Sequence, residues 1–435
     1  MILKRANKIT IKNKLMENRK RNRKNSLMKK FKAIGRKNKL MKKPRKKQRQ
    51  KISKKNRVNA HKKNIVEKKI KINEDNEKKE IYIINEDEND KTIIPGLIGL
   101  SNIGATCYMN ATLQCFSNVV RLRQMLLKED VYNNLEKEKS RTKLLSFSFA
   151  EVLYNIWVNN NNTNKYYAPE NFKNVISKMN PLFKGIEAND SKDLILFMLE
   201  NIHNELNIKD NMTLNSNITC NPDPRNFNEV YKDFKDNYIN YNDSIISQEF
   251  YGFNDIQTKC ATCQTIIHNV QLYNILFFPL EEVRKFKNYN FNTVSINDCF
   301  EYNQKMDYYP LFYCNYCRNN CQAFSQTFLI DAPKTLIINL NRGKGIQFNI
   351  NIKFEEFLNL KNYVFNNQQI YYYELIGVLS HYGPSNMGGH FISFCKNSED
   401  GNWYKFNDAM VDLSSFDEVC NSGMPYVLFY SYINV

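Results

Sequence analysis

The first half of the folded sequence repeats its apolar residues at the spacing of amphipathic helices. The pattern is clearest over Asp190–Leu206, because residues three or four positions apart share one face of a helix. The apolar residues there are Leu194, Met198, Ile202 and Leu206. Asp190 precedes this stretch as a helix cap, and Asp193 follows three positions later as in a capping box. The helices predicted in this way are Cys107–Val119, Ser146–Val158, Pro169–Met179 and Asp190–Leu206.

The second half of the sequence is rich in the β-branched and aromatic residues that favour strands. The strands predicted there are Glu249–Thr258, Thr265–Leu280, Phe324–Asn341, Tyr371–His381, His390–Lys396, Trp403–Phe406 and Pro425–Ile433. Between the two halves, Asn207–Ser247 is rich in Asn and Asp and contains Pro222 and Pro224, so a surface insertion with at most one short helix is predicted. Helices followed by strands predict an α+β protein.

Charge separates an N-terminal tail from the rest of the chain. Residues 1–70 contain 30 Lys or Arg and two acidic residues, whereas residues 71–435 have a net charge of −9. A segment with so few apolar side chains cannot bury enough surface to offset the entropy of ordering it. We therefore expect residues 1–94 to be a disordered basic tail before a folded domain at 95–435.

The run Lys42–Arg49 within this tail has the composition of a nuclear import signal or a nucleic-acid contact. Dense positive charge binds phosphate through the release of counterions. A solvated extension rich in Lys and Asn, with neither role, explains the run equally well. The run gives a nuclear location a slight preference over the cytoplasm.

Membrane and secretory signals are absent from the sequence. No stretch approaches the roughly 20 apolar residues of a spanning helix, and the N-terminus lacks the apolar core of a secretory signal. We therefore expect an intracellular protein that does not bind membranes. Eleven cysteines in such a chain predict reduced thiols, metal ligands or a nucleophile in place of a disulfide framework.

The run GLSNIGATCYMN ends at Asn110 and leads a glycine turn into a predicted helix that starts at Cys107. Free backbone N–H groups and the positive end of a helix dipole stabilise a thiolate, so we expect a lowered pKa for Cys107. Asn102 lies just upstream, where its side-chain amide can donate to a developing oxyanion. A lone cysteine at a helix start is more often a small buried residue, but Asn102 and the glycine turn favour a nucleophile at Cys107. Cys115, two turns further along the helix, has no such setting and is assigned to the core.

The run HYGPSNMGGHF joins two predicted strands through a glycine-rich loop. A cysteine nucleophile needs a general base, and that base needs an orienting group on its second nitrogen. Among the five histidines, only His381 and His390 border the loop, and His390 has the better setting. Pairing of its strand with the following one would place Asn407 or Asp408 beside the imidazole.

Two Cys-x-x-Cys pairs predict a structural zinc site with four thiolate ligands. The pairs are Cys260 with Cys263 and Cys314 with Cys317. The 50 residues between the pairs exceed the usual spacing of a zinc ribbon and predict a long β excursion. Cys321 is a substitute ligand with poorer spacing, and unrelated reduced thiols are the alternative.

Taken together, these motifs resemble those of the ubiquitin-specific proteases, in the same order along the chain. The matching parts are residues 99–110, 190–194, the two cysteine pairs, 336–342 and 388–406. The resemblance covers residues 96–433 and implies a papain-like cysteine protease fold described as a hand. A helical thumb at about 96–206, zinc-bearing fingers at about 255–330 and a β-rich palm would make up that hand.

The resemblance implies roles for individual residues. Cys107 matches the nucleophile, His390 the general base, Asn102 the oxyanion side chain and Asn407 the third member of the triad. An Asn there fixes the imidazole tautomer but adds no negative charge, so Asp408 is a candidate to supply that charge.

The same resemblance implies how the substrate is held. Asp190 matches an acidic residue that holds an arginine of the ubiquitin tail, while Asp193 stands where the family usually has Glu. Ala188 replaces a Gln of that motif, which weakens the expected recognition of the tail. Gly388 and Gly389 suit a channel too narrow for side chains, where the Gly-Gly end of ubiquitin lies close to the backbone.

The implied function is hydrolysis of the bond after the C-terminal glycine of ubiquitin through a thioester on Cys107. Structural zinc would be bound, with no catalytic cofactor, and ubiquitin and ubiquitinated proteins would be the partners. A catalytically inactive ubiquitin-binding scaffold is the alternative within the same fold. A zinc-ribbon nucleic-acid binder is the alternative from another class, and it leaves the motifs around Cys107 and His390 unexplained.

Overall fold

The computed structural model describes residues 94–138, 143–159, 165–209, 222–289, 292–343, 349–365, 371–383, 389–421 and 423–433. The tail up to residue 93, which we predicted to be disordered, and Gly388 lie outside these residues. Within the described part of the chain, every helix is too short or too polar to cross a membrane.

Helices dominate the described chain up to residue 250. Their bounds are α2 (Cys107–Ser117), α3 (Val120–Leu126), α4 (Glu129–Glu138), α5 (Leu144–Trp157), α6 (Glu170–Met179), the 3₁₀ turn η2 (Pro181–Phe183), α7 (Ser191–Leu206), α8 (Phe227–Tyr241) and α9 (Ile245–Phe250). The four predicted helices correspond to α2, α5, α6 and α7, with ends that agree within two residues. Asp190 is the N-cap of α7, as predicted, and its carboxylate accepts a 2.9 Å hydrogen bond from the N–H of Lys192.

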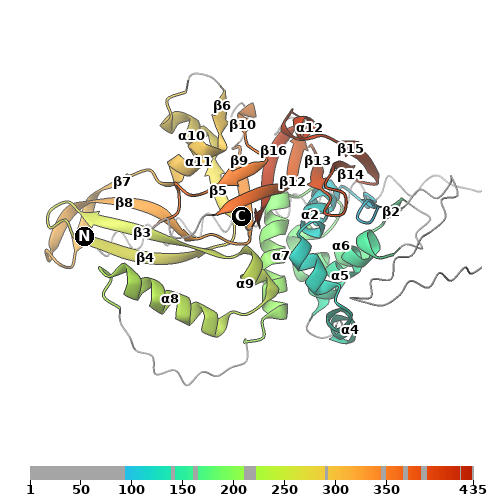
Figure 1. Cartoon of the computed structure of the whole chain (residues 1–435), viewed down its shortest axis with the longest axis horizontal. Coiled ribbons are helices and arrows are strands. Elements are labelled where there is room, and N and C mark those ends of the chain that lie inside the picture. Colours follow the sequence, from blue (N-terminus) through green and yellow to red (C-terminus); the bar gives the residue numbers. More distant parts are fainter. Residues whose placement is uncertain are drawn as a thin grey trace, which may run out of the picture. The chain divides into compact units, whose positions relative to one another are not determined.

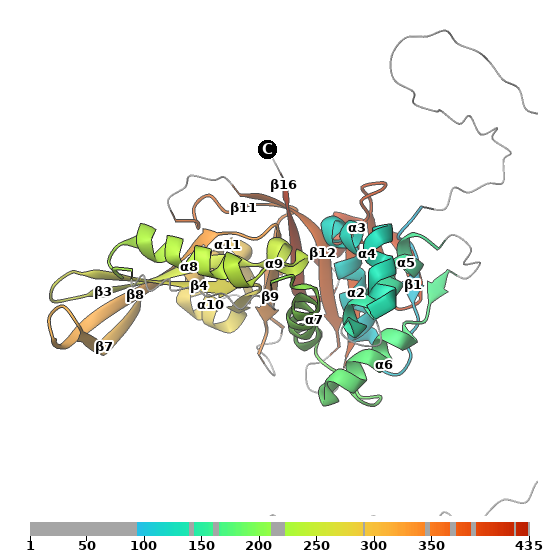
Figure 2. The same ribbon diagram turned by 90° about the horizontal axis from the view of Figure 1, so that it is seen from below.

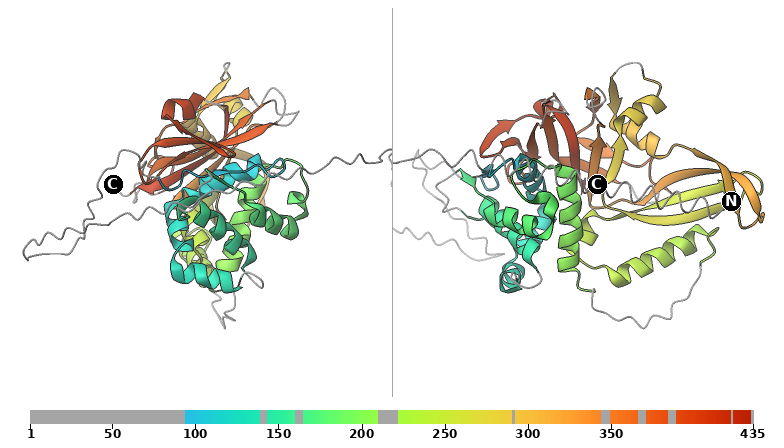
Figure 3. Two further views of the ribbon diagram at one scale, coloured as in Figure 1. Left: turned by 90° about the vertical axis from the view of Figure 1, so that its right-hand side faces the viewer. Right: turned by 180° about the vertical axis from the view of Figure 1, so that it is seen from behind.

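An eight-stranded sheet forms the second layer, with the spatial order β15-β14-β13-β12-β16-β9-β5 and β11 added to β12. The strands are β5 (Leu276–Pro279), β9 (Thr335–Asn341), β11 (Phe357–Asn359), β12 (Tyr372–Tyr382), β13 (His390–Lys396), β14 (Trp403–Asn407), β15 (Met410–Ser414) and β16 (Met424–Ile433). All neighbours are antiparallel except β5 and β9. The predicted hairpin of β13 and β14 is confirmed, with Ser393 opposite Phe406. Figure 3 shows the cyan and green helices of the N-terminal half packed along one side of this sheet.

A separate four-stranded antiparallel sheet, which we call the finger sheet, extends away from the helices (Figure 1). Its order is β4-β3-β8-β7, and its strands are β3 (Gly252–Cys260), β4 (Ile266–Tyr273), β7 (Asp307–Cys314) and β8 (Asn319–Asp331). Figure 2 shows α3 to α6 gathered at one end of the folded part and the finger sheet at the other. The turns of the two hairpins carry the two Cys-x-x-Cys pairs.

The prediction for Asn207–Ser247 was wrong, because this segment contains the 15-residue helix α8. Aromatic residues of α8 pack at helical spacing on the apolar cluster of Phe253, Val270 and Ile330 in the finger sheet, and Asn and Asp between them concealed that periodicity. These residues are Phe227, Tyr231, Phe234 and Tyr238.

The segment between the two cysteine pairs contains strands, as predicted, but it also contains helices and is therefore not a β excursion alone. That segment leaves the finger sheet to supply β5 to the large sheet, and then forms α10 (Leu280–Phe286), β6 (Thr293–Ser295) and α11 (Ile296–Asn303). Strand β10 (Asn351–Lys353) pairs with β6, β1 (Gly99–Leu100) pairs with β2 (Tyr166–Tyr167), and α12 (Phe416–Asn421) precedes β16.

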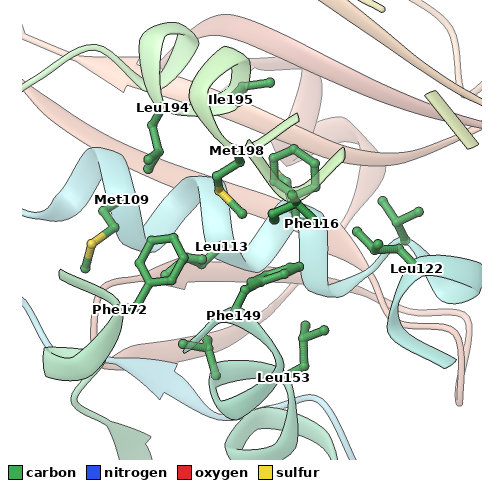
Figure 4. Packing of buried hydrophobic residues seen from close by; sticks show 14 of the residues in the cluster. Met109, Leu113, Phe116, Leu122, Phe149, Leu153, Phe172, Leu194, Ile195 and Met198 are labelled. Atoms are coloured by element: carbon green, nitrogen blue, oxygen red, sulfur yellow. The ribbon is translucent and has the colours of Figure 1, made fainter. Parts of the chain in front are cut away.

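Helix α2 lies inside the larger core, and all eleven of its residues are buried. Figure 4 shows its apolar side chains against those of the helices around it. The residues drawn there include Met109, Leu113, Phe116, Phe149, Phe172, Leu194 and Met198. Cys115 is fully buried, as predicted, with its sulfur 3.9 Å from that of Cys395 on β13. The helix that starts at Cys107 is therefore held firmly against the strand that starts at His390.

Candidate active site

Cys107 is the first residue of α2, and only 5% of it is exposed. The side-chain oxygen of Asn102 shapes the preceding loop by accepting hydrogen bonds from the N–H groups of Thr106 at 3.0 Å and Gly104 at 3.3 Å. Gly104 has a φ of 119°, which glycine adopts with little strain. The helix that follows this turn packs against β13, and the N–H group of Phe391 on that strand favours the thiolate form of Cys107.

Burial raises the pKa of the Cys107 thiol above its ordinary value. The N–H groups of Phe391, Tyr108 and Cys107 act in the opposite direction, and the negative charge of Asp408 adds to the increase. Our expectation of a lowered pKa was therefore wrong for the free protein, because removal of the thiolate from water outweighs its contacts with N–H groups. Cys107 is therefore a thiol at neutral pH, and it would need a base in order to act as a nucleophile.

His390 is the first residue of β13, and its Nε2 atom lies 2.6 Å from Oδ1 of Asn407 at the end of β14. An amide oxygen only accepts hydrogen bonds, so Nε2 is the donor in this contact and Nδ1 is the ring nitrogen that Asn407 does not contact. Asp408 approaches the same nitrogen less closely, with Oδ2 at 3.9 Å. Asn407 is thus the direct partner of the imidazole, and Asp408 contributes charge from a greater distance.

Asp408 makes its closest contacts with the segment around Cys107. Its carboxylate accepts hydrogen bonds from the side-chain amides of Asn102 at 3.0 Å and Asn110 at 2.8 Å. Its backbone oxygen accepts a 2.8 Å hydrogen bond from the N–H of Leu100. The sequence predicts Asn407 or Asp408 as the partner of one imidazole, and it assigns no role to Asn110. The position of Asn110 one turn after the nucleophile is the signal that could have identified it.

The predicted substrate residues at the start of α7 differ in their surroundings. Asp190 is partly buried, and its Oδ2 accepts a 2.7 Å hydrogen bond from the hydroxyl of Tyr426 on β16. Asp193 is 40% exposed and pairs with the ammonium of Lys192 at 3.4 Å, so it does not close the predicted capping box. Ala188 is exposed in the loop before α7.

Gly389 lies immediately before His390 and leaves no room for a side chain. A Cβ atom at this position would lie 2.1 Å from Nε2 of His381 and 2.8 Å from the backbone oxygen of Tyr382. His381 is half-buried at the end of β12, and burial lowers its pKa. The structure thus separates the two histidines, since His390 meets Asn407 whereas His381 packs beneath Gly389. Gly388 lies outside the described residues.

The four predicted metal ligands come together at the turns of the finger sheet. The Sγ atoms of Cys260, Cys263, Cys314 and Cys317 all lie within 4.8 Å of one another. Cys260 is 3.9 Å from Cys317, and Cys263 is 3.7 Å from Cys314. Four thiolates about 2.3 Å from a tetrahedral zinc ion are separated by about 3.8 Å, so the arrangement fits such an ion. Cys321 lies outside this cluster, and its thiol contacts the backbone oxygen of Asn319 at 3.5 Å.

Sequence comparison finds one family along most of the chain. Residues 98–430 match the family model for ubiquitin carboxyl-terminal hydrolases. Ubiquitin carboxyl-terminal hydrolase 2 from Homo sapiens is 27% identical over 77% of this chain and 55% of its own length. Ubiquitin carboxyl-terminal hydrolase 21 from Mus musculus is 25% identical over 77% of this chain and 61% of its own length. The chain therefore spans little more than half the length of these relatives.

Solved structures share the fold. The SAGA DUB module of Ubp8, Sgf11, Sus1 and Sgf73 bound to monoubiquitin contains a chain that matches with a TM-score of 0.59 and 23% identity, over 80% of this chain and 73% of that one. A second structure of the Ubp8-Sgf11-Sgf73-Sus1 module matches with a TM-score of 0.54 and 24% identity, over 79% of this chain and 71% of that one. The predicted α+β fold with a cysteine cluster in its fingers is confirmed.

Proposed function

The chain belongs to the ubiquitin carboxyl-terminal hydrolase family, and from that premise we propose that it is an active thiol-dependent deubiquitinase. It hydrolyses the isopeptide or peptide bond after the C-terminal glycine of ubiquitin. One observation carries the proposal. Cys107 at the start of α2 lies on a helix packed against β13, whose first residue His390 is oriented through Nε2 by Asn407 at 2.6 Å.

The first half of the reaction forms a thioester. Nδ1 of His390 takes the proton of the Cys107 thiol while the sulfur attacks the carbonyl carbon of the terminal glycine. Negative charge then develops on the carbonyl oxygen, where the second N–H of the Asn102 amide and the first N–H groups of α2 donate hydrogen bonds. His390 returns the proton to the amine nitrogen of the leaving group, and the C–N bond breaks.

The second half releases ubiquitin. His390 takes a proton from a water molecule whose oxygen attacks the thioester carbonyl, and the C–S bond breaks. The departing sulfur of Cys107 recovers that proton from His390, so the thiol and the neutral imidazole are both restored. Because burial raises the pKa of Cys107, the imidazole acts as a true general base in the first half and not as half of a preformed ion pair.

Ubiquitin is the proposed partner and zinc the proposed structural metal. The Ubp8 module that shares this fold is bound to monoubiquitin, which supports ubiquitin as the group recognised here. Zinc held by the cysteine cluster would lock the two hairpins of the finger sheet together and would supply no catalytic chemistry. The run Lys42–Arg49 is proposed to direct the chain to the nucleus in preference to the cytoplasm, through an import receptor or nucleic acid. The location of a chain with this run replaced by Gln would test that role.

A ubiquitin that carries a C-terminal electrophile distinguishes an active enzyme from a ubiquitin-binding scaffold. An active chain forms a covalent adduct with it, seen as a mass increase of one ubiquitin, and also hydrolyses a ubiquitin amide. Cys107→Ala is expected to form no adduct and to retain ubiquitin binding, whereas the buried-core control Cys115→Ala still forms the adduct. Binding without any adduct by the unmodified chain would make it a scaffold.

A further inference from the structure

The carboxylate of Asp190 is fixed by two hydrogen bonds from opposite parts of the fold. The N–H of Lys192 donates to Oδ1 at 2.9 Å, and the hydroxyl of Tyr426 donates to Oδ2 at 2.7 Å. Tyr426 lies on β16, 236 positions later in the chain. An ionised carboxylate has about four lone-pair directions, so roughly half of its accepting capacity remains on its partly exposed side.

Tyr426 is itself held in place and keeps its proton. Its ring meets that of Phe391 edge-on, with 5.6 Å between the centroids, and its backbone oxygen accepts a 3.4 Å hydrogen bond from Asn339. Burial raises the pKa of Tyr426, and the negative charge of Asp190 raises it further. The hydroxyl therefore remains a donor at neutral pH, and its direction is set by a ring that cannot move freely.

We propose that Tyr426 is a positioning residue that holds Asp190 as the grip for a guanidinium group of the bound ubiquitin tail. The inference rests on the proposed function, which supplies the arginine-bearing tail. A carboxylate held in one orientation matches the planar fork of a guanidinium through two parallel hydrogen bonds, which an ammonium ion cannot form. Loss of the Tyr426 hydroxyl would leave Asp190 free to rotate and would weaken binding of arginine in particular.

The same tyrosine relates this grip to the nucleophile. Phe391 packs on Tyr426, and its backbone N–H favours the thiolate form of Cys107 by lowering the pKa of that thiol. Asp190 and Cys107 are thus connected through two side chains in direct contact, on the two strands β16 and β13. This connection sets the distance, along the ubiquitin tail, between the arginine held by Asp190 and the carbonyl group attacked by Cys107.

Steady-state kinetics on two fluorogenic ubiquitin amides test the proposal. One substrate has the natural tail, and in the other the tail arginines are replaced by leucine. With the natural tail, Tyr426→Phe is expected to raise KM about ten-fold and to leave kcat within about two-fold. With the leucine tail, the same substitution should change kcat/KM by less than about two-fold, and it should add nothing to Asp190→Ala.

Tyr430→Phe is the matched control, because it removes a buried hydroxyl from the same strand. That hydroxyl donates to the backbone oxygen of Glu355 at 2.7 Å, so the control should leave the dependence on tail arginine unchanged. Equal losses with both substrates in Tyr426→Phe, or a lowered melting temperature and kcat with an unchanged KM, would overturn the positioning role. If the unmodified chain hydrolyses neither substrate, the proposed function fails. The positioning role is then tested by calorimetry, which measures the affinity of the chain for the two ubiquitins. Equal weakening of both by Tyr426→Phe would again overturn the proposal.

Discussion

The side-chain amide of Asn102 donates a 3.0 Å hydrogen bond to the carboxylate of Asp408, which lies 306 positions later in the chain. Asn110 donates a second hydrogen bond to the same carboxylate at 2.8 Å. Nε2 of His390 is 3.9 Å away and has Asn407 as its closer partner. We infer that Asp408 acts mainly by holding the oxyanion donor in place and only secondarily through its charge on the base.

Substitutions at Asn102 and Asp408 should therefore be coupled. Asn102→Ala is expected to lower kcat by about 10² to 10³, because it removes a preorganised donor to the oxyanion. Asp408→Asn places an N–H group against two amide donors, so it should lower kcat as well. In a double-mutant cycle measured by kcat, the double variant should be little worse than Asn102→Ala alone. Fully additive losses would show that Asp408 acts through His390.

Asn407 should be required for the orientation of the base. Asn407→Ala is expected to lower kcat on the order of 10² to 10⁴, because the imidazole loses the acceptor that fixes its tautomer. Asn407→Asp keeps that acceptor and adds a negative charge, which raises the pKa of the imidazole. The acid limb of the kcat/KM profile should therefore move to higher pH in Asn407→Asp. An unmoved acid limb would show that residue 407 does not contact the base in the active enzyme.

The raised pKa of Cys107 has a measurable effect on its alkylation. Below that pKa the thiolate fraction, and hence the rate, rises about ten-fold for each pH unit. Reaction of the free protein with iodoacetamide, followed by mass spectrometry of the Cys107 peptide, should show this rise from about pH 7 to pH 9 without a plateau. A constant rate across this range would mean that a thiolate is already present in the free protein.

The raised pKa of Cys107 also makes the stability of the fold depend on pH. Folding raises the pKa of Cys107, so the neutral thiol stabilises the fold below the unfolded-state pKa of about 8.5 to 9. That contribution is lost as the pH rises through the folded-state pKa. The free energy of unfolding, measured by chemical denaturation, should therefore fall more above pH 9 in the unmodified chain than in Cys107→Ala.

Removal of a metal ligand should affect the fingers and spare the chemistry. The purified protein is expected to contain about one zinc per chain by elemental analysis, and Cys260→Ser should lose the metal and melt at a lower temperature. Adduct formation at Cys107 should persist at a temperature where the domain stays folded. Cys321→Ser is the control, because its sulfur lies outside the cluster. Loss of zinc in that control would place Cys321 among the ligands.

The helices α7 and α8 show what local sequence could predict. Leu194 and Met198 lie in an apolar run of α7 and are fully buried, so the helical spacing of the apolar residues can be recognised in the sequence. The aromatic residues of α8 pack on the finger sheet and on Tyr251 and Phe365, and no residue of that helix is fully buried. The helical spacing of these aromatic residues was hidden among Asn, Asp and Lys, because a helix with only a narrow apolar face consists mostly of polar residues.

The site divides in the same way between local and distant contacts. The pairing of β13 with β14 places Asn407 beside His390, and that pairing could be predicted from two neighbouring strands. The contact of Asp408 with Asn102 depends on a turn in which Asp408 has a φ of 52°, and on the docking of β1 against that turn. The pKa of Cys107 depends on burial by all the surrounding elements. Neither can be read from a motif, because both arise only when segments far apart in the sequence meet.

The position of strand β16 determines when the sheet can be completed during synthesis of the chain. It is the last strand described, yet it lies between β12 and β9 in the interior of the sheet. Cys107 leaves the ribosome roughly 300 residues before this strand, an interval of about 15 to 60 s at ordinary rates of synthesis. We expect Cys107 of a nascent chain to lie outside an assembled site during this interval. Until β16 is synthesised, the unpaired edges of β12 and β9 would be exposed to chaperones.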